Sequence, residues 1–380
     1  MNILYCIPHL YNAGGMERVV TQKINWLITH TDHTITIVTT ECAPKGTPAV
    51  YFPLDPRVEV IHLNIDFNAD YTKPLFLKWF GHMHRMRAYR RALQQFIASH
   101  TIDLCISTGG KEIAFARHLP CRTMIEMHFA KEQRQQLLMA NHKGKLWALF
   151  GHIRTAQLVR AVKPIERLVV LTESDKAAWE RAGCTNVICI PNICSLDGQQ
   201  IPQTSKTNTV LAVGRLHEQK GFDLLLQAWK KIENQYTDWT LRIVGEGPKR
   251  ADLENQIHDL QLQHVVLAGR INDVKNEYTK ASLFVLSSRY EGLPLALIEA
   301  MWSELPCVAF DCPNGPAELL ANERGWLVPA ENVEALAMQL EYAMRNPDEA
   351  EKRARKAQQY AQQTYSEAAI MPQWKKIIEQ

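Results

Sequence analysis

The chain has 380 residues, of which 46% are hydrophobic and 22% are charged, and its formal net charge is +3. This length favours two domains over a single core, and this composition is typical of a globular protein in water. No apolar run approaches the roughly 18 to 20 residues of a membrane-spanning helix, and the nine cysteines include no C-x-x-C pair. These features argue against an integral membrane protein or a disulfide scaffold, and they predict a cytoplasmic location.

Short apolar runs alternate with amphipathic or polar stretches along nearly the whole chain. Strand-like runs occupy residues 3–8, 34–39, 104–107, 123–127 and 168–171, and then residues 209–213, 241–244, 265–267, 283–286 and 307–310. Helix-like stretches, such as residues 17–30, lie between them. This alternation predicts parallel sheets covered by helices on both faces, as in doubly wound α/β domains.

A polar stretch at residues 191–208 is typical of a linker and divides the chain into two such domains. Residues 1–167 carry 21 Lys/Arg against 12 Asp/Glu, whereas residues 168–380 carry 22 against 28. The first part is therefore basic and suits an anionic surface such as a phospholipid leaflet or nucleic acid. Because doubly wound domains bind ligands at the carboxyl ends of their strands, we expect a cleft between the domains at these ends.

Two sets of glycines follow predicted strands. Gly14 and Gly15 open the helix after the first strand, and Gly245 and Gly247 follow the strand at 241–244. Neither set completes G-x-G-x-x-G, so the sequence gives little support to a nicotinamide dinucleotide site.

The junction between the strand at 283–286 and the following helix is the most informative segment. Gly292 permits a turn, and Pro294 stands at the expected first helical position. Glu291 then lies on the loop and Glu299 in the second helical turn. A helix start attracts anions through its free N–H groups, and carboxylates accept hydrogen bonds from hydroxyls. The junction therefore predicts a nucleotide sugar site, with the diphosphate on the backbone and hydroxyls on the two acids.

Two cations and a histidine follow other predicted strands. Arg215 and Lys220 come after the strand at 209–213, where they could neutralise a nucleotide diphosphate and stabilise it as a leaving group. A solvated basic loop beside Glu218 is the alternative. His128 follows the strand at 123–127 and could point into the cleft as a backbone-fixing or acid–base group. A histidine in that place can also simply be satisfied by its neighbours.

No Asp-x-Asp pattern, with which many sugar transferases hold a metal ion, occurs in the chain. The sequence therefore predicts no metal and no cofactor, and it assigns charge neutralisation to Arg215, Lys220 and the helix start.

The stretch at residues 71–102 contains six Lys/Arg, several aromatic residues and no acidic residue. A basic, aromatic-rich amphipathic helix is typical of an element that lies on an anionic membrane surface. A solvated helix with its apolar side in the core is the alternative. Because no recognition fold accompanies this stretch, we expect no nucleic-acid partner.

In their order and spacing, these residues resemble family GT4 of the retaining glycosyltransferases, whose GT-B fold has two facing Rossmann-like domains. The resemblance covers essentially the full length. Its matching elements are Glu291 and Glu299 as E-x7-E, Arg215 and Lys220 as donor-phosphate cations, Gly14 and Gly15 as the first loop, and His128. Residues 244–248 and 267–270 also match the family.

The resemblance implies a role for each domain. Residues 1–190 would bind the acceptor, residues 191–360 would bind the donor, and a helix at 361–380 would pack back onto the first domain. Glu299 would hold the ribose and Glu291 the donor sugar, while His128 would hydrogen-bond that sugar near its anomeric carbon. Backbone and side-chain contacts to the rest of the donor would come from Gly14, Gly15, Gly245, Arg270, Gly292, Leu293 and Leu295.

The subgroup that the chain most resembles builds surface polysaccharides, lipopolysaccharides or lipid-linked glycans in bacteria. The resemblance thus implies a metal-independent hexosyltransferase that moves a sugar from a nucleoside diphosphate to a lipid-linked or polysaccharide hydroxyl. UDP is the first expectation for the donor, with GDP and ADP open. A lipid-linked acceptor would place the protein peripherally on the inner face of the cytoplasmic membrane. Two alternatives stay open, a nucleotide-sugar 2-epimerase of the same fold and a non-catalytic sugar-nucleotide-binding protein.

Overall fold

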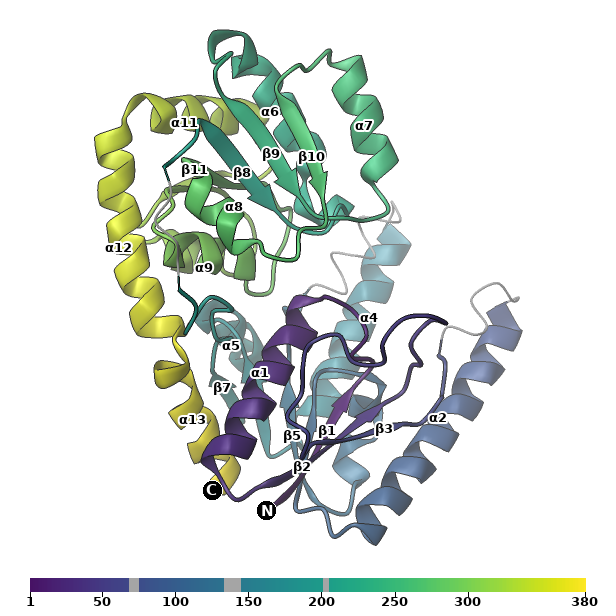
Figure 1. Cartoon of the computed structure of the whole chain (residues 1–380). Helices are drawn as coiled ribbons and strands as arrows, with labels where there is room; N and C mark the ends of the chain where they lie inside the picture. Colours follow the sequence, from purple (N-terminus) through teal and green to yellow (C-terminus); the bar gives the residue numbers. More distant parts are fainter. Residues whose placement is uncertain (68–74, 133–144, 201–204) are drawn as a thin grey trace. The chain divides into compact units, whose positions relative to one another are not determined.

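The computed structural model describes residues 1–67, 75–132, 145–200 and 205–380. The chain divides into two compact units (Figure 1). The first unit consists of Met1–Ile190 together with Met371–Gln380, and the second consists of Pro191–Ile370. Each unit is built on its own parallel sheet with helices around it, which confirms the predicted α/β class.

In its described residues, the first unit has a seven-stranded parallel sheet with the order β3-β2-β1-β4-β5-β6-β7. The strands are β1 (Asn2–Ile7), β2 (Thr34–Thr39), β3 (Glu59–His62), β4 (Leu104–Ser107), β5 (Arg122–Glu126), β6 (Arg167–Val170) and β7 (Val187–Cys189). The connecting elements are α1 (Gly15–His30), α2 (Leu75–Ser99), α4 (Lys145–Val162), α5 (Glu173–Arg181) and the 3-10 turns η1 (Lys111–Ala114) and η2 (Ala116–His118).

Alternate residues of a strand point to opposite faces of its sheet. In β1, Leu4 and Cys6 pack in one cluster with Tyr89 and Leu93 of α2. Lys23 of α1 instead lies over the ring of Tyr5, at 5.5 Å from its centroid. Helices therefore cover both faces, and this is why the central strands consist almost entirely of apolar residues.

In its described residues, the second unit has a six-stranded parallel sheet with the order β10-β9-β8-β11-β12-β13. The strands are β8 (Thr209–Val213), β9 (Thr240–Val244), β10 (Val265–Gly269), β11 (Leu283–Leu286), β12 (Cys307–Asp311) and β13 (Trp326–Pro329). The helices are α6 (Phe222–Ile232), α7 (Arg250–Asp259), α8 (Lys275–Lys280), α9 (Leu295–Trp302), α10 (Pro316–Leu320), α11 (Val333–Arg345) and α12 (Pro347–Tyr365), with the 3-10 turns η3 (Glu218–Lys220) and η4 (Glu233–Gln235).

The C-terminal segment contains two helices where the sequence predicted one over 361–380. Helix α12 ends at Tyr365, and α13 (Glu367–Glu379) begins after Ser366, whose backbone is extended. The N–H of Ala369 donates to the Ser366 hydroxyl at 3.3 Å, as at a helix start. A serine with this preference for capping explains the break.

Every predicted strand is present, with bounds shifted by two residues at most. The three strands that were not predicted, β3, β7 and β13, each lie at the edge of a sheet. Helix α9 begins at Leu295, so Pro294 occupies the cap and not the first helical position. In the part of the chain that the structure describes, no helix is long and apolar enough to cross a membrane.

Candidate active site

The strand order of the second sheet places a topological switch point between β8 and β11. From β8 the chain continues to β9 and β10 on one side, and from β11 it continues to β12 and β13 on the other. Loops at the carboxyl ends of such a pair of strands are where open α/β sheets bind ligands. Arg215 and Lys220 follow β8, and Glu291 and Gly292 follow β11. The topology therefore brings these predicted residues to one edge of one sheet.

Lys220 and Glu291 form an ion pair at this edge. The Lys220 ammonium donates to Glu291 Oε1 at 2.7 Å, and the Ser288 hydroxyl donates to the same oxygen at 2.6 Å. The Glu291 side chain is 6% exposed and that of Lys220 is 19% exposed. The carboxylate is thus held in one orientation, while the ammonium keeps some access to solvent.

Two glycines let the strand-end loops touch through their backbones. Gly221 has a φ of 61°, and a Cβ on it would lie 2.0 Å from the Ser287 carbonyl oxygen. Gly245, with a φ of 146°, approaches the Gly214 carbonyl oxygen in the same way, at 1.9 Å. A larger residue at either position would push the loops after β8, β9 and β11 apart.

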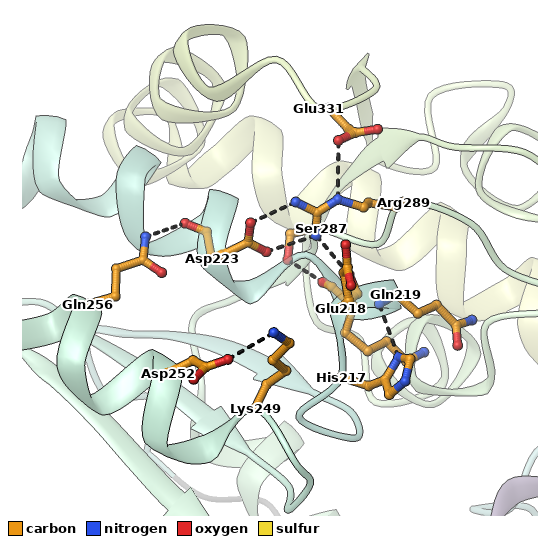
Figure 2. Close-up of polar contacts among 11 residues, drawn as sticks. His217, Glu218, Gln219, Asp223, Lys249, Asp252, Gln256, Ser287, Arg289 and Glu331 are labelled. Carbon is orange, nitrogen blue, oxygen red and sulfur yellow. Dashed lines mark hydrogen bonds and ion pairs between the residues drawn. The ribbon is translucent and has the colours of Figure 1, made fainter. Parts of the chain in front are cut away.

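Arg289 ties the loop after β11 to the start of α6 (Figure 2). Its two terminal nitrogens donate to Asp223 Oδ1 and Oδ2 at 2.8 and 2.6 Å, and its Nε donates to Glu331 at 3.2 Å. A further bond runs from Nη1 to the Glu218 carbonyl oxygen at 2.7 Å. Because a two-pronged guanidinium–carboxylate contact fixes both partners in direction, Arg289 sets the spacing of the loops that carry Lys220 and Glu291.

Glu299 lies in the second turn of α9, as predicted, and is buried. The Tyr278 hydroxyl donates to Glu299 Oε2 at 2.8 Å, and the Ser195 hydroxyl donates to Oε1. Each carboxylate oxygen can accept more than one hydrogen bond. The Glu299 carboxylate is therefore held in one orientation by hydrogen bonds from two hydroxyl groups.

The other predicted donor-binding residues lie around the same sheet edge. The side chains of Arg215, after β8, and of Arg270, after β10, are exposed. Leu293 is buried, and Leu295 opens α9. In the described residues the Arg215 guanidinium has no ion-pair partner, so its charge is available to an anion in solution.

Gly14 and Gly15 stand at the start of α1 in the first unit, as predicted. The buried carboxylate of Glu17 folds back over this start, since a Cβ on Gly14 would lie 2.1 Å from Glu17 Oε2. His9 Nδ1 lies 3.0 Å from Glu17 Oε1. Burial opposes a charge on His9, but the hydrogen bond and charge of Glu17 outweigh burial and raise the pKa of this histidine. A ligand anion at this helix start would have to displace Glu17.

His128 follows β5 and belongs to a buried charged cluster. Its Nε2 lies 3.2 Å from Glu126 Oε1, while the Lys23 ammonium donates to Glu126 Oε2. The side chains of Lys23 and Glu126 are each 1% exposed. Burial pushes the pKa of Glu126 upward, but the charges of Lys23 and His128 outweigh it and hold the pKa at about 2. The Lys23 ammonium also lies 3.7 Å from the centroid of the Trp374 ring of α13.

The predicted site residues therefore form two groups, one in each unit. Several residues that fix their geometry carried little signal in the sequence. Ser288 and Arg289 lie inside the segment that the sequence singled out, but Ser195 is 104 residues from Glu299 and Lys23 is 103 residues from Glu126. Lys23 lies at the helical spacing of Val19, Val20 and Leu27, so its place on the apolar face of α1 could have been found in the sequence, although its partner could not.

The sequence was compared with known protein families and proteins, and its matches are glycosyltransferases. Residues 197–363 match the family model of glycosyl transferases group 1. An uncharacterized glycosyltransferase of Haemophilus influenzae is 34% identical over 98% of this chain and 99% of its own. An alpha-1,4-N-acetyl-D-galactosaminyltransferase of Campylobacter jejuni, named for a PP-undecaprenol-linked glycan, is 27% identical over 100% of this chain and 98% of its own.

Among solved structures, TarM of Staphylococcus aureus in a complex that includes UDP superimposes with a TM-score of 0.80 at 16% identity, covering 100% of both chains. The two Rossmann-like units and this likeness confirm the predicted GT-B fold. The full-length relative of Haemophilus influenzae shows the family. The chain belongs to the glycosyl transferases of group 1.

Proposed function

We propose that the chain is a retaining glycosyltransferase that moves a sugar from a nucleoside diphosphate to a hydroxyl of a glycan or lipid-linked acceptor. The observation that carries this proposal is the Lys220–Glu291 pair at the switch point of the second sheet, beside the exposed Arg215. UDP as the donor nucleotide is supported by its presence in the TarM complex. A lipid-linked acceptor is supported by the PP-undecaprenol-linked glycan in the name of the Campylobacter jejuni relative, and we extend the proposal to the synthesis of a bacterial surface glycan.

In the proposed donor complex, the diphosphate meets Arg215, Lys220 and the N–H groups at Gly292, Leu293 and Leu295. Lys220 leaves Glu291 and turns toward the phosphate, so that the freed Oε1 accepts a hydrogen bond from the donor sugar. Glu299 accepts from the ribose, and Gly245 and Arg270 lie toward the nucleotide. His128 and the loop at Gly14 and Gly15 act from the first unit.

In the proposed reaction, the bond between the anomeric carbon and the leaving phosphate oxygen breaks. The acceptor oxygen bonds to the same face of that carbon, and its proton passes to the departing phosphate oxygen. Once the donor is bound, the charges of Arg215 and Lys220 already face the diphosphate, and they stabilise it as it leaves without a metal ion. No residue has to form a covalent intermediate in this path.

We also place the protein on an anionic membrane surface at the inner face of the cytoplasmic membrane, through the first unit. Residues 71–74 of the predicted basic stretch lie outside the described residues, and Tyr89 is buried in the core. Helix α2 nevertheless exposes Leu77, Trp79 and Phe80. Helix α4 exposes Trp147, Leu149 and Ile153, and like α2 it contains no acidic residue. Such exposed apolar side chains among cations suit a lipid leaflet.

The membrane contact can be tested by co-sedimentation with vesicles of phosphatidylglycerol and with vesicles of phosphatidylcholine. We expect binding to the anionic vesicles, weakened in Trp79→Ser/Phe80→Ser. Met338→Ser removes an equally exposed apolar side chain from the second unit and serves as the control. Equal sedimentation of all three proteins would contradict the proposal.

The donor site can be tested by thermal shift with UDP, GDP and ADP and their sugars, on wild type and Arg215→Ala. A ligand at a hundredfold its Kd should stabilise the protein by about 2.7 kcal/mol. We expect one nucleotide to stabilise wild type and to lose this effect in Arg215→Ala, while Arg345→Ala, an exposed arginine of α11, behaves as wild type. Retention is then read from the anomeric configuration of the product by NMR. An epimerised donor formed without acceptor would instead identify a 2-epimerase.

A further inference from the structure

Glu299, the acid proposed to hold the ribose, accepts a hydrogen bond from a different hydroxyl group on each of its carboxylate oxygens. The Tyr278 hydroxyl donates to Oε2 at 2.8 Å, and the Ser195 hydroxyl donates to Oε1. The two neighbouring hydroxyls of a ribose could donate to a carboxylate in the same way. These two side chains therefore make on Glu299 the hydrogen bonds that a nucleotide would make.

The two hydroxyl groups differ in how firmly the protein holds them. Tyr278 belongs to α8 and is 0% exposed, and its ring lies against that of Phe284 in β11, with centroids 6.0 Å apart. Ser195 is only partly buried and lies on a turn, outside any helix or strand. A packed tyrosine cannot leave its place without opening a void in the core, whereas a serine on a turn can adopt another rotamer. Ser195 is therefore the donor that a ligand can replace.

The turn that carries Ser195 lies near both places where the chain passes from one unit to the other. The first passage is at residues 190–191 and the second is at residues 370–371. Residues 194–197 follow the first passage and residues 365–367 precede the second. Both of these stretches belong to the second unit.

Two hydrogen bonds join these stretches on either side of Ser195. The N–H of Cys194 donates to the Tyr365 carbonyl oxygen at 2.8 Å. The N–H of Glu367, at the start of α13, donates to Asp197 Oδ2 at 2.6 Å. Because Ser195 lies between Cys194 and Asp197 in the chain, a movement that takes its hydroxyl off the carboxylate acts directly on both bonds.

We propose that Ser195 occupies the position of a ribose hydroxyl on Glu299 until a nucleotide binds, and that its displacement loosens the bonds between residues 194–197 and 365–367. One ribose hydroxyl then donates to Oε1, while Tyr278 stays on Oε2 and keeps the carboxylate oriented. Occupation of the donor site is in this way transmitted to the chain connections between the units. The inference rests on the proposed function, because it requires a nucleotide whose ribose meets Glu299.

Isothermal titration calorimetry on the full chain tests the displacement. The ligands are UDP, GDP and ADP and their dideoxyribose counterparts, which lack both ribose hydroxyls. In wild type, the dideoxy form of the bound nucleotide should bind more weakly, because it cannot donate to Glu299. Ser195→Ala removes the hydroxyl that the ribose must displace, so its Kd for the ribonucleotide should fall about fivefold. Its Kd for the dideoxy nucleotide should equal that of wild type.

Two further variants serve as comparisons. Ser282→Ala removes a serine hydroxyl of the same unit that donates to the Thr207 carbonyl oxygen at 2.8 Å, and it should bind both nucleotides as wild type does. Tyr278→Phe removes the fixed donor and should weaken binding of the ribonucleotide. The opposite signs for Ser195→Ala and Tyr278→Phe separate a displaced hydroxyl from one that only orients the acid.

Hydrogen exchange of the Cys194 and Glu367 amides, followed by NMR, tests the loosening. Exchange should become faster when wild type binds the ribonucleotide and should not change with its dideoxy form. In Ser195→Ala it should be fast before any nucleotide is added, since the restraint on the turn is already gone.

Each part of the proposal can fail separately from the donor site. A Kd of Ser195→Ala for the ribonucleotide equal to or above that of wild type would overturn the proposal, as would an equal gain for the dideoxy form. Unchanged exchange at Cys194 and Glu367 on ribonucleotide binding would overturn it as well. If wild type bound none of the three ribonucleotides, the donor site itself would be refuted, and this inference with it.

Discussion

A lysine–glutamate pair lies at the strand ends of each sheet, and the two pairs differ in how far solvent reaches them. In the first unit Lys23 and Glu126 are each 1% exposed, and the ring of Trp374 covers the ammonium. In the second unit Lys220 is 19% exposed and Glu291 is 6% exposed. A buried ion pair costs desolvation and cannot change partners without leaving a charge unpaired. A partly open pair can exchange one partner for a ligand.

This difference in solvent exposure indicates that the two ion pairs have different roles. Lys23 and Glu126 hold a fixed charge distribution beside His128, and removing either one should damage the fold of the first unit. Lys220 and Glu291 form a resting contact that a diphosphate and a sugar can replace, so removing Lys220 should damage turnover and spare the fold.

The largest effect on stability is expected from Lys23→Met. This substitution leaves the Glu126 carboxylate buried without its main partner, which typically costs about 3 to 5 kcal/mol of unfolding free energy. Lys23→Met/Glu126→Leu should recover most of the loss, because well-packed apolar side chains often replace a buried pair at little cost. Urea unfolding followed by fluorescence measures both variants.

Lys176→Met is the control for this experiment, since Lys176 is a partly exposed lysine of α5 that pairs with Glu173 and Glu180 of its own helix. Its loss should cost about 0.5 kcal/mol or less. If Lys23→Met were as stable as Lys176→Met, the buried pair would have no structural role.

The corresponding change in the second unit is Lys220→Met, and it should reduce turnover strongly and stability only slightly. We expect turnover to fall about 100- to 1,000-fold, the usual loss when one preorganised group that stabilises developing charge is removed. The unfolding free energy should fall by only about 1 kcal/mol, because Glu291 keeps the hydrogen bond from Ser288. Initial rates with the stabilising nucleotide sugar and urea unfolding are measured on the same preparation.

Lys249→Met provides the matched control for Lys220→Met, because Lys249 pairs with Asp252 at 2.8 Å in the same unit but is 45% exposed (Figure 2). It should alter neither turnover nor stability appreciably. A Lys220→Met protein that unfolds early yet turns over normally would mean that the two pairs do not differ in function.

The same contrast explains what the sequence could predict. The fold followed from apolar runs in central strands, which are buried on both faces, whereas β3, β7 and β13 have a neighbour on one side only and carry weaker patterns. Short motifs mark such junctions, and the sequence therefore located Arg215, Lys220 and Glu291 on the loops after their strands and Glu299 in the second turn of α9. Their roles in binding stay predictions. The periodicity of α1 places Lys23 on its apolar face, but the pairing of Lys23 with Glu126 depends on how α1 and α13 pack against the sheet, and no local pattern records that pairing.

A pH titration should detect the buried pair through Glu126. Its pKa is depressed from an ordinary 4.5 to about 2 in the folded state, so its contribution to stability is present above about pH 4.5 and is lost as the pH falls toward 2. The expected loss is about 3 kcal/mol across this window. The measurement is the difference in unfolding free energy between wild type and Glu126→Gln at several pH values. A difference that does not shrink as the pH falls would contradict the depressed pKa.

The smallest effect is expected from Ser288→Ala, which tests the open pair without removing a charge. The Ser288 hydroxyl and the Lys220 ammonium donate to the same oxygen, Glu291 Oε1. If Lys220 turns to the diphosphate when the donor binds, Ser288 alone keeps Glu291 oriented toward the sugar. Loss of one such hydrogen bond, worth about 1 kcal/mol, should then lower kcat/KM about fivefold.

Ser282→Ala is the control, because its hydroxyl also makes one hydrogen bond, to the Thr207 carbonyl oxygen at 2.8 Å, but at the opposite end of β11. Equal rates for Ser288→Ala and wild type would mean that Lys220 stays on Glu291 during the reaction. The proposal that Lys220 leaves Glu291 for the diphosphate would then be wrong. The Lys220–Glu291 pair would instead stay together during the reaction, like the Lys23–Glu126 pair. A fall in kcat/KM for Ser288→Ala alone would instead show that the orientation of Glu291 matters once Lys220 has moved.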